Sequence, residues 1–419
     1  ACLAATGKTL KDRQTTFNTA IMKYDFDEKI SREGTNCEKM DLREQIFGRA
    51  DVIPMWVADM DFAAPPAVIE AVRKRAEHPI LGYSYRSDSY RQSIIGWVDR
   101  HSGWKIQREW LDFTPGVVSG IVYAMRAFTQ PGDRIVIQPP VYHPFARQIR
   151  LNDRVVVNNP LREVNGHYEI DFDDLDQKLA DAKVLLLCNP HNPTGRVFTR
   201  EELTRIGQLC VKHDVLIFAD EIHGDLVYQP HRHLHIASLD DQFASRTLTF
   251  IAPSKTFNLA GAGIAAIIAA DPKVRAKIDR AVNDNECCDV NVFGVAADIA
   301  AWNQGEEWLE ALLSYLQGNL AAAQAFFAEK LPLCRLSKLE GTYLLWADMR
   351  PMLGADLDTD AFCESLKTHE KVWAAAGSHY GRDGEGFVRI NIATQRALLL
   401  EGLTRLAAGA ERWQNREKE

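Results

Sequence analysis

Lys255 is the only charged residue between Phe250 and Ala270, a stretch made mostly of alanine, glycine and isoleucine. A lysine that lies far from water must pair with an acid, extend to the surface, or no longer be an ordinary ammonium. In the last case its amine would serve as a nucleophile or a base. The chemical role of Lys255 therefore depends on the groups that lie beside it.

Polar side chains follow four short apolar segments that we predict to be β-strands. The segments are residues 134–138, 183–188, 215–219 and 247–251. The side chains that follow them are, in chain order, Tyr142, Asn192, Asp220, His223, Ser254 and Lys255. Ligands bind beyond the carboxyl ends of the strands in an open parallel sheet, so we expect these groups to meet at one site.

Residues 111–128 predict a strand, a glycine turn and the start of a helix, with Gly116, Val117 and Val118 at that start. Free amides at a helix N-terminus bind anions such as phosphate. The site thus offers an aromatic ring, an amide, a carboxylate, a lysine and an anion site. Pyridoxal 5′-phosphate (PLP) needs this set, because its aldehyde bonds a lysine amine and its pyridine nitrogen needs a carboxylate. We therefore predict PLP as the cofactor.

The elements that position these groups alternate between about Leu111 and Ala270, where short apolar segments are separated by helical patterns. Residues 263–270 form a further predicted strand, and residues 199–214 a helix with Thr199 as its N-cap. Apolar strands separated by helices indicate a parallel sheet covered on both faces. The expected fold class is therefore α/β.

We expect four parts along the chain. Residues 1–21 are predicted to be a disordered extension or a remnant of cloning, and residues 22–75 an N-terminal segment that packs with a small domain. Residues 76–305 form the large cofactor-binding domain, and residues 306–419 the small C-terminal domain. The last part reads as mainly helical, with predicted strands at 341–349 and 386–393, which indicates a smaller α+β unit.

The amino-acid composition and net charge limit which classes of molecule the protein is expected to bind. The 419 residues are 46% hydrophobic and 25% charged, which is typical of a globular protein with a large core. The formal net charge of −8 argues against nucleic-acid or anionic-membrane partners. No segment reads as a membrane-spanning helix, and the start of the sequence does not read as a signal peptide. Eight scattered cysteines without a CxxC motif favour a reducing, cytoplasmic location.

Three motifs in this order resemble a known family: "NPHNPTGR" at 189–196, "ADEIH" at 219–223 and "APSKTFNLAG" at 252–261. They resemble fold-type I PLP enzymes of the class I/II aminotransferase superfamily. Residues 52–72, 81–98, 340–350 and 384–393 are similar to its carbon–sulfur β-lyase branch, the cystathionine β-lyase/cystalysin (MalY/PatB) type. The resemblance extends from about Lys23 to Leu406, and it implies a mostly parallel seven-stranded sheet between helices.

The resemblance implies a role for each candidate residue. Lys255 would form the Schiff base and act as catalytic base, Asp220 would hold the pyridine nitrogen, and Asn192 would donate to the ring oxygen. Tyr142 would stack on the ring and is a second catalytic candidate. Arg389 would bind the substrate α-carboxylate through its bidentate fork.

The remaining candidates concern the phosphate, the partner subunit and the reaction. Gly116, Val117, Val118 and Ser254 would bind the phosphate, and Tyr83 would reach the phosphate of a neighbouring subunit in a homodimer with shared active sites. His223 stands near the ring oxygen, where many aminotransferases carry tyrosine and the lyase branch carries histidine.

The expected reaction is β-elimination of L-cystathionine, L-cysteine or related S-substituted cysteines to a thiol, pyruvate and ammonia. Two alternatives remain open from the sequence: an aminotransferase, which shares every step through proton abstraction, and a lyase with an additional regulatory protein-binding role.

The stretch "HRHLH" at 231–235 could suggest a metal site because it contains three histidines. It lacks supporting carboxylates or cysteines nearby, so we expect solvated loop histidines and no metal site.

Overall fold

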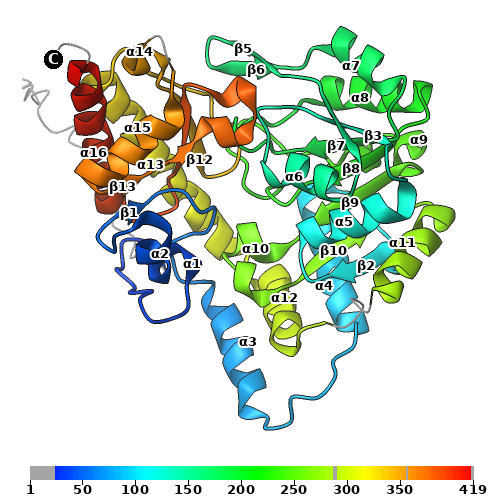
Figure 1. Cartoon of the computed structure of the whole chain (residues 1–419). Helices are drawn as coiled ribbons and strands as arrows, with labels where there is room; N and C mark the ends of the chain where they lie inside the picture. The colour runs from blue at the N-terminus through cyan, green and yellow to red at the C-terminus, as the bar shows by residue number, and fades with distance from the viewer. Residues whose placement is uncertain (1–23, 286–289, 355–356, 417–419) are drawn as a thin grey trace, which may run out of the picture.

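The computed structural model describes residues 24–285, 290–354 and 357–416 (Figure 1). The predicted extension at residues 1–21 lies outside these ranges. Two sheets organise the described chain, a larger one in the middle of the sequence and a smaller one toward its C-terminal end. Among the helices of these ranges, none is both long and apolar enough to cross a membrane.

The larger sheet has seven strands in the order β2-β10-β9-β8-β7-β3-β4. Strands β4, β3, β7, β8 and β9 run parallel, whereas β10 is antiparallel to both of its neighbours. This arrangement confirms the α/β fold class and the mostly parallel sheet. The strand bounds are β2 Leu111–Thr114, β3 Arg134–Ile137, β4 Val155–Asn158, β7 Val184–Cys188, β8 Leu216–Asp220, β9 Thr247–Ile251 and β10 Ala265–Ile268.

Side chains of the central strands alternate between two apolar layers, which explains why these strands read as continuous apolar runs. In β7, Leu185 and Leu187 pack in one layer, while Val184 and Leu186 pack in the other. The first layer includes α7 (Phe172–Leu179) and α8 (Arg200–Lys212), and the second includes α5 (Val117–Phe128), α6 (Pro144–Leu151) and α11 (Pro272–Asp284). Burial on both faces removes the polar alternation of a half-exposed strand.

Helix α8 shows how local sequence signals fixed an element. The Thr199 side chain accepts the Glu202 N–H, and the Glu202 side chain accepts the Thr199 N–H, which forms a capping box. The predicted helix at 199–214 is therefore confirmed, with its N-cap at the expected residue. By contrast β4 had not been singled out from the sequence, and its half-exposed Val155–Asn158 segment is the outer edge of the sheet.

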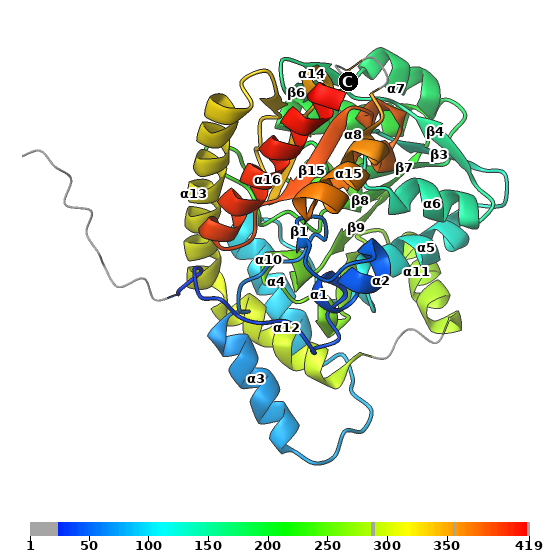
Figure 2. The ribbon, with the colours of Figure 1, turned by 60° about the vertical axis from the view of Figure 1, so that its left-hand side comes forward.

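The smaller sheet has the order β11-β12-β15-β14 and is antiparallel. Its strands include those predicted at 341–349 and 386–393. Strand β1 of the N-terminal segment pairs in parallel with β13, so this segment lies against the C-terminal part of the chain (Figure 2). The domain boundaries themselves stay a prediction. The bounds are β1 Ile53–Pro54, β11 Arg335–Leu336, β12 Leu344–Asp348, β13 Val372–Trp373, β14 Ala375–Ala376, β15 Phe387–Asn391, α13 Glu306–Lys330, α15 Thr359–Ser365 and α16 Arg396–Asn415.

Helix α3 (Pro66–Glu77) projects from the body of the molecule, and an extended segment then leads to α4 (Asp88–Ser102) (Figures 1 and 2). Helix α12 (Val292–Gln304) packs against both of them. Shorter elements complete the fold: α1 Glu38–Asp41, α2 Arg43–Phe47, α9 Asp241–Ala244, α10 Pro253–Thr256, α14 Arg350–Leu353, β5 Arg162–Val164 and β6 His167–Glu169.

Candidate active site

A cavity of about 410 Å³ lies beyond the carboxyl ends of β7, β8 and β9. Its walls come from these strand ends, the N-terminus of α5, strand β15 and the N-terminal segment. The structure brings together every candidate residue except Tyr83. The candidates in the walls are Gly116, Val117, Val118, Tyr142, Asn192, Asp220, His223, Ser254, Lys255 and Arg389. Tyr83 is 99% exposed, on the segment between α3 and α4.

Lys255 enters the cavity from α10, which begins directly after β9. Its Nζ donates to the Ala58 carbonyl at 2.6 Å. Burial, reinforced by the nearby Arg389 charge, lowers the pKa of Lys255 to about 8. About a tenth of this amine is therefore neutral at pH 7, far more than for an ordinary lysine, and the neutral form is the one that acts as a nucleophile or base.

Asp220 ends β8 and is buried. Its Oδ1 accepts the Ile222 N–H at 3.2 Å. Burial raises the pKa of Asp220 to about 7, although the backbone hydrogen bond and Lys255 act in the opposite direction. A carboxyl group with so few partners is suited to stabilise a cation that enters the cavity.

Arg389 lies in the middle of β15 and reaches the cavity from the smaller sheet. Its Nη1 donates to Asn192 Oδ1 at 3.0 Å, and its Nη2 donates to the Trp56 carbonyl. The guanidinium carbon also lies 5.1 Å from the centre of the Tyr380 ring. These contacts orient the guanidinium and join the two sheets at the cavity.

Three buried polar atoms of the cavity walls have no hydrogen-bond partner within the described part of the chain: Nε of Arg389, Nδ1 of His223 and Nε1 of Trp56. Unsatisfied buried donors and acceptors cost free energy, and several in one cavity indicate a polar ligand. The residues present therefore fit a small molecule that carries both anionic and cationic groups, as PLP does.

The N-terminus of α5 faces the same cavity. Gly116 is the N-cap and supplies no side-chain cap, so the first-turn amides of Val117 and Val118 remain without that partner. Ser254 adds a hydroxyl to this wall. Amides at a helix N-terminus and a neighbouring hydroxyl are suited to bind a phosphate.

Tyr142 and His223 are neutral groups in these walls. Burial, followed by the Asp220 charge, raises the pKa of Tyr142 to about 12, so the phenol keeps its proton. Burial lowers the pKa of His223 well below its usual value, with Lys255 and Arg389 acting in the same direction. The His223 ring packs edge-on against Tyr343 at 5.9 Å.

Sequence reasoning missed several residues of the cavity: Glu38, Trp56, Ala58, Ser119 and His143. Trp56 and Ala58 act through backbone carbonyls, which no side-chain pattern reveals. Ser119 follows the predicted phosphate residues on α5, so its position in the first helical turn was the one available signal.

Comparisons with known proteins agree with this geometry. The family model for aminotransferases of class I and II matches residues 50–406. The chain is 42% identical to cystathionine beta-lyase PatB of Bacillus subtilis, over 91% of this chain and 99% of the relative. It is 33% identical to protein MalY of Escherichia coli, over 91% of this chain and 98% of the relative.

Among solved structures, cystalysin from Treponema denticola, which contains a PLP cofactor, superposes with a TM-score of 0.90. The sequences are 34% identical, and the match covers 93% of this chain and 100% of cystalysin. The family model and these relatives each span most of the chain, so the protein belongs to the class I and II aminotransferase family and has the fold-type I architecture of its PLP enzymes.

Proposed function

We propose that this protein is a PLP-dependent carbon–sulfur β-lyase of the cystathionine β-lyase type. It cleaves L-cystathionine, L-cysteine or related S-substituted cysteines to a thiol, pyruvate and ammonia. The observation that carries the proposal is the buried Lys255 amine, with a pKa of about 8, in one cavity with Asp220 and Arg389. The 42% identity to a cystathionine beta-lyase over nearly the whole chain supports the reaction type.

The proposed cofactor site uses the groups that the protein alone leaves without strong partners. Lys255 would bond PLP, Asp220 would hold its pyridine nitrogen, and Asn192 and His223 would stand near its ring oxygen. Tyr142 would stack on the ring. The amides of Gly116, Val117 and Val118, together with Ser254, would take the phosphate.

Bound in this cavity, PLP would supply an aldehyde for the substrate amino group and an electron sink for the electron pair that develops at Cα. Arg389 fixes the substrate carboxylate, and its buried, unpartnered Nε is a free donor for that purpose. Lys255 removes the Cα proton as general base. Lys255 or Tyr142 then supplies the proton to the departing sulfur, which the raised pKa of Tyr142 permits.

Incubating the purified protein with L-cystathionine and no 2-oxo acid tests the reaction. We expect pyruvate and a free thiol in equal amounts. An aminotransferase would turn over only after a 2-oxo acid is added, and it would form no thiol. Turnover that depends on an added oxo acid would therefore replace the lyase with the transferase.

We also propose a homodimer with shared active sites. The projecting helix α3 and the segment after it expose a group of large apolar side chains, which a second copy would cover. The exposed fractions are Ile69 55%, Ile80 68%, Leu81 58%, Tyr83 99% and Tyr85 79%. Tyr83 would then reach the phosphate of the partner's cofactor.

The five cysteines that the structure describes as free support a reducing, cytoplasmic location.

Complementation between two defective variants tests the shared site. Lys255→Ala removes the base, and Tyr83→Ala removes the proposed partner contact. Co-expressed as a heterodimer, the two chains combine one intact Lys255 with one intact Tyr83 in a single site. We expect activity above that of either variant alone, whereas no gain would show that each chain uses its own Tyr83 or none.

A further inference from the structure

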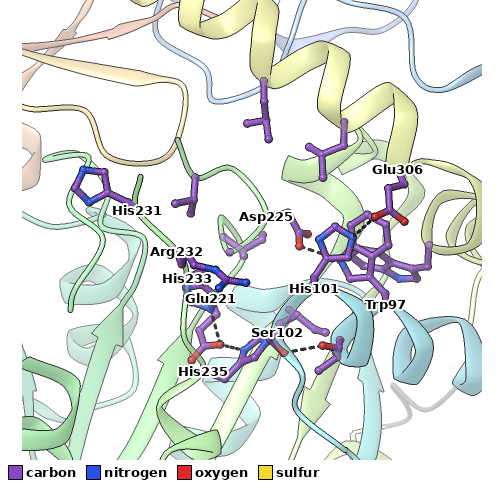
Figure 3. Close-up of a pocket in the computed structure, with 18 of the residues that line it drawn as sticks. Trp97, His101, Ser102, Glu221, Asp225, His231, Arg232, His233, His235 and Glu306 are labelled. Atoms are coloured by element: carbon purple, nitrogen blue, oxygen red, sulfur yellow. Dashed lines mark hydrogen bonds and ion pairs between the residues drawn. The ribbon is translucent and has the colours of Figure 1, made fainter. Parts of the chain in front are cut away.

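A second cavity, of about 250 Å³, lies next to the first one, and Figure 3 shows residues that line it. It is lined by α4, the start of α13 and the segment that follows β8. Ile222 and Ala252 line both cavities, so the two share a wall. The proposed lyase reaction uses no polar side chain of this second cavity.

Glu221, His233 and His235 meet in the wall of the second cavity, and Figure 3 shows the three side chains pointing toward one another. His233 Nε2 lies 3.1 Å from Glu221 Oε2, and His235 Nδ1 contacts the same oxygen. Their side chains are only 1%, 7% and 9% exposed in that order. The expectation of solvated loop histidines is therefore wrong for His233 and His235.

His233 and His235 are buried because the fold brings together two segments that are separate in the sequence. Glu221 directly follows β8, and its carboxylate is buried at the end of the sheet. His233 and His235 are two positions apart in an extended stretch, so both side chains leave the same side of the chain toward that carboxylate. The supporting acid that the sequence lacked near "HRHLH" is thus supplied from an earlier part of the chain.

The charges of the cluster favour an added cation. The Glu221 carboxylate is buried between two imidazoles and contacts both rings through Oε2. Such a charge needs a positive partner, which either a proton on an imidazole or a metal dication can provide.

The geometry is already close to that of a metal centre. One ligand atom of each residue can be chosen so that all three lie within 4.8 Å of one another. Donor atoms of a tetrahedral zinc site, with bonds of about 2.0 to 2.1 Å, lie about 3.3 Å apart. Binding of the ion would require side-chain movements that bring the three atoms to that spacing. Among the described residues, the other polar contact of the His233 ring is between Nδ1 and Asn189 Nδ2, and at 3.5 Å it is too long to fix the tautomer.

We propose that Glu221, His233 and His235 bind a divalent transition-metal ion, and that its fourth position opens to the second cavity. Two imidazoles with one carboxylate and no thiolate are a ligand set that suits Zn²⁺. The ion ties the loop of His233 and His235 to the end of β8, beside Asp220. The proposed lyase reaction makes no use of the ion, because its three ligands line the second cavity and not the cavity that holds Lys255.

Metal binding to the purified, untagged holoenzyme tests the site. After removal of metals with a chelator, the protein is titrated with Zn²⁺ and its metal content is measured. We expect one Zn²⁺ per chain, and about a 100-fold or greater loss of affinity in a His233→Ala/His235→Ala variant, which keeps one of three ligands. His231→Ala is the matched control, because His231 is exposed in the same loop and should leave binding unchanged.

A second measurement needs no variant and so does not depend on whether the double variant folds. X-ray absorption of the Zn²⁺-loaded wild-type protein should show nitrogen and oxygen ligands with the scattering of two imidazoles. Absence of stoichiometric binding, equal binding by the double variant, or sulfur ligands would each overturn the proposal. The PLP absorbance, recorded in parallel, separates loss of this site from loss of the proposed cofactor site.

Discussion

Asp220 and Glu221 are neighbours at the end of β8, both are buried, and yet they differ in charge state. The pKa of Asp220 is raised to about 7, whereas the pKa of Glu221 is lowered to about 2. Burial disfavours both carboxylates, but only Glu221 has two imidazoles against it. Side chains alternate along an extended strand, so the two acids face different cavities.

The two acids show how the proposed catalytic cavity differs from the cluster around Glu221. On the Asp220 side, Lys255 has a lowered pKa and Arg389 keeps an unpartnered Nε, so the groups stay available for a ligand. On the Glu221 side, two imidazoles of the same chain contact the carboxylate, and none of these three side chains lines the cavity that holds Lys255. Perturbed groups without partners are typical of functional sites, and the following predictions test this division.

The largest effect is expected in the cavity that contains Asp220 and Lys255. Lys255→Ala removes the proposed base and should lower pyruvate formation from L-cystathionine by at least about 1,000-fold. Lys273→Ala, at an exposed lysine of α11, is the matched control and should keep full activity. Lyase activity retained in Lys255→Ala would remove Lys255 from the reaction and with it the basis of the comparison.

The two neighbouring acids should respond differently to loss of their charge. Asp220→Asn should lower pyruvate formation by at least about 100-fold, because PLP would lose the proposed partner of its pyridine nitrogen. Glu221→Gln should keep most of the activity, since Glu221 faces the other cavity. Equal losses of activity in the two variants would contradict the division between catalytic and structural sides.

The pH dependence of stability also distinguishes these two acids. It is measured by unfolding the cofactor-free protein with a chelator present. The raised pKa of Asp220 means that its stabilising contribution is lost as pH rises from about 4 to 7. Asp220→Asn should therefore gain stability over wild type across that interval.

The lowered pKa of Glu221 gives a contribution to stability that is present above pH 4.5 and lost toward pH 2. Glu221→Gln should thus be less stable than wild type at pH 7, and the difference should shrink below pH 4.5.

Arg389→Lys tests whether the unpartnered guanidinium binds the substrate carboxylate. A lysine keeps the charge but loses the planar fork, so KM for L-cystathionine should rise about 10- to 100-fold. The PLP absorbance should be unchanged, because Arg389 is assigned to substrate and not to cofactor. A loss of bound PLP with unchanged KM would assign Arg389 to the cofactor instead.

The smallest expected effect concerns the pH dependence of cofactor uptake. With the pKa of Lys255 lowered to about 8, its neutral fraction rises about tenfold between pH 7 and 9 and then levels off. The rate of PLP incorporation into cofactor-free protein, followed by absorbance, should follow that curve. An ordinary lysine would instead give a rise of about 100-fold without a plateau.

Much of the fold was predictable because its signals are local. The apolar runs of β3, β7, β8 and β9 and the capping residue Thr199 depend on a few adjacent residues. The cavity was predictable in part, since polar groups after parallel strands must meet at one edge of the sheet. The backbone carbonyls of Trp56 and Ala58 were not predictable, because they come from an irregular segment far away in the chain.

The amino-acid sequence by itself determined the reactive groups and their order: a lysine after one buried strand, an acid after another, and an amide after a third. Only the tertiary structure decided which groups are left without partners. Arg389 reaches Asn192 from the other sheet, and His233 and His235 turn toward Glu221 and not toward solvent. A pKa depends on burial and on nearby charges, and folding brings both from segments that are distant in the sequence.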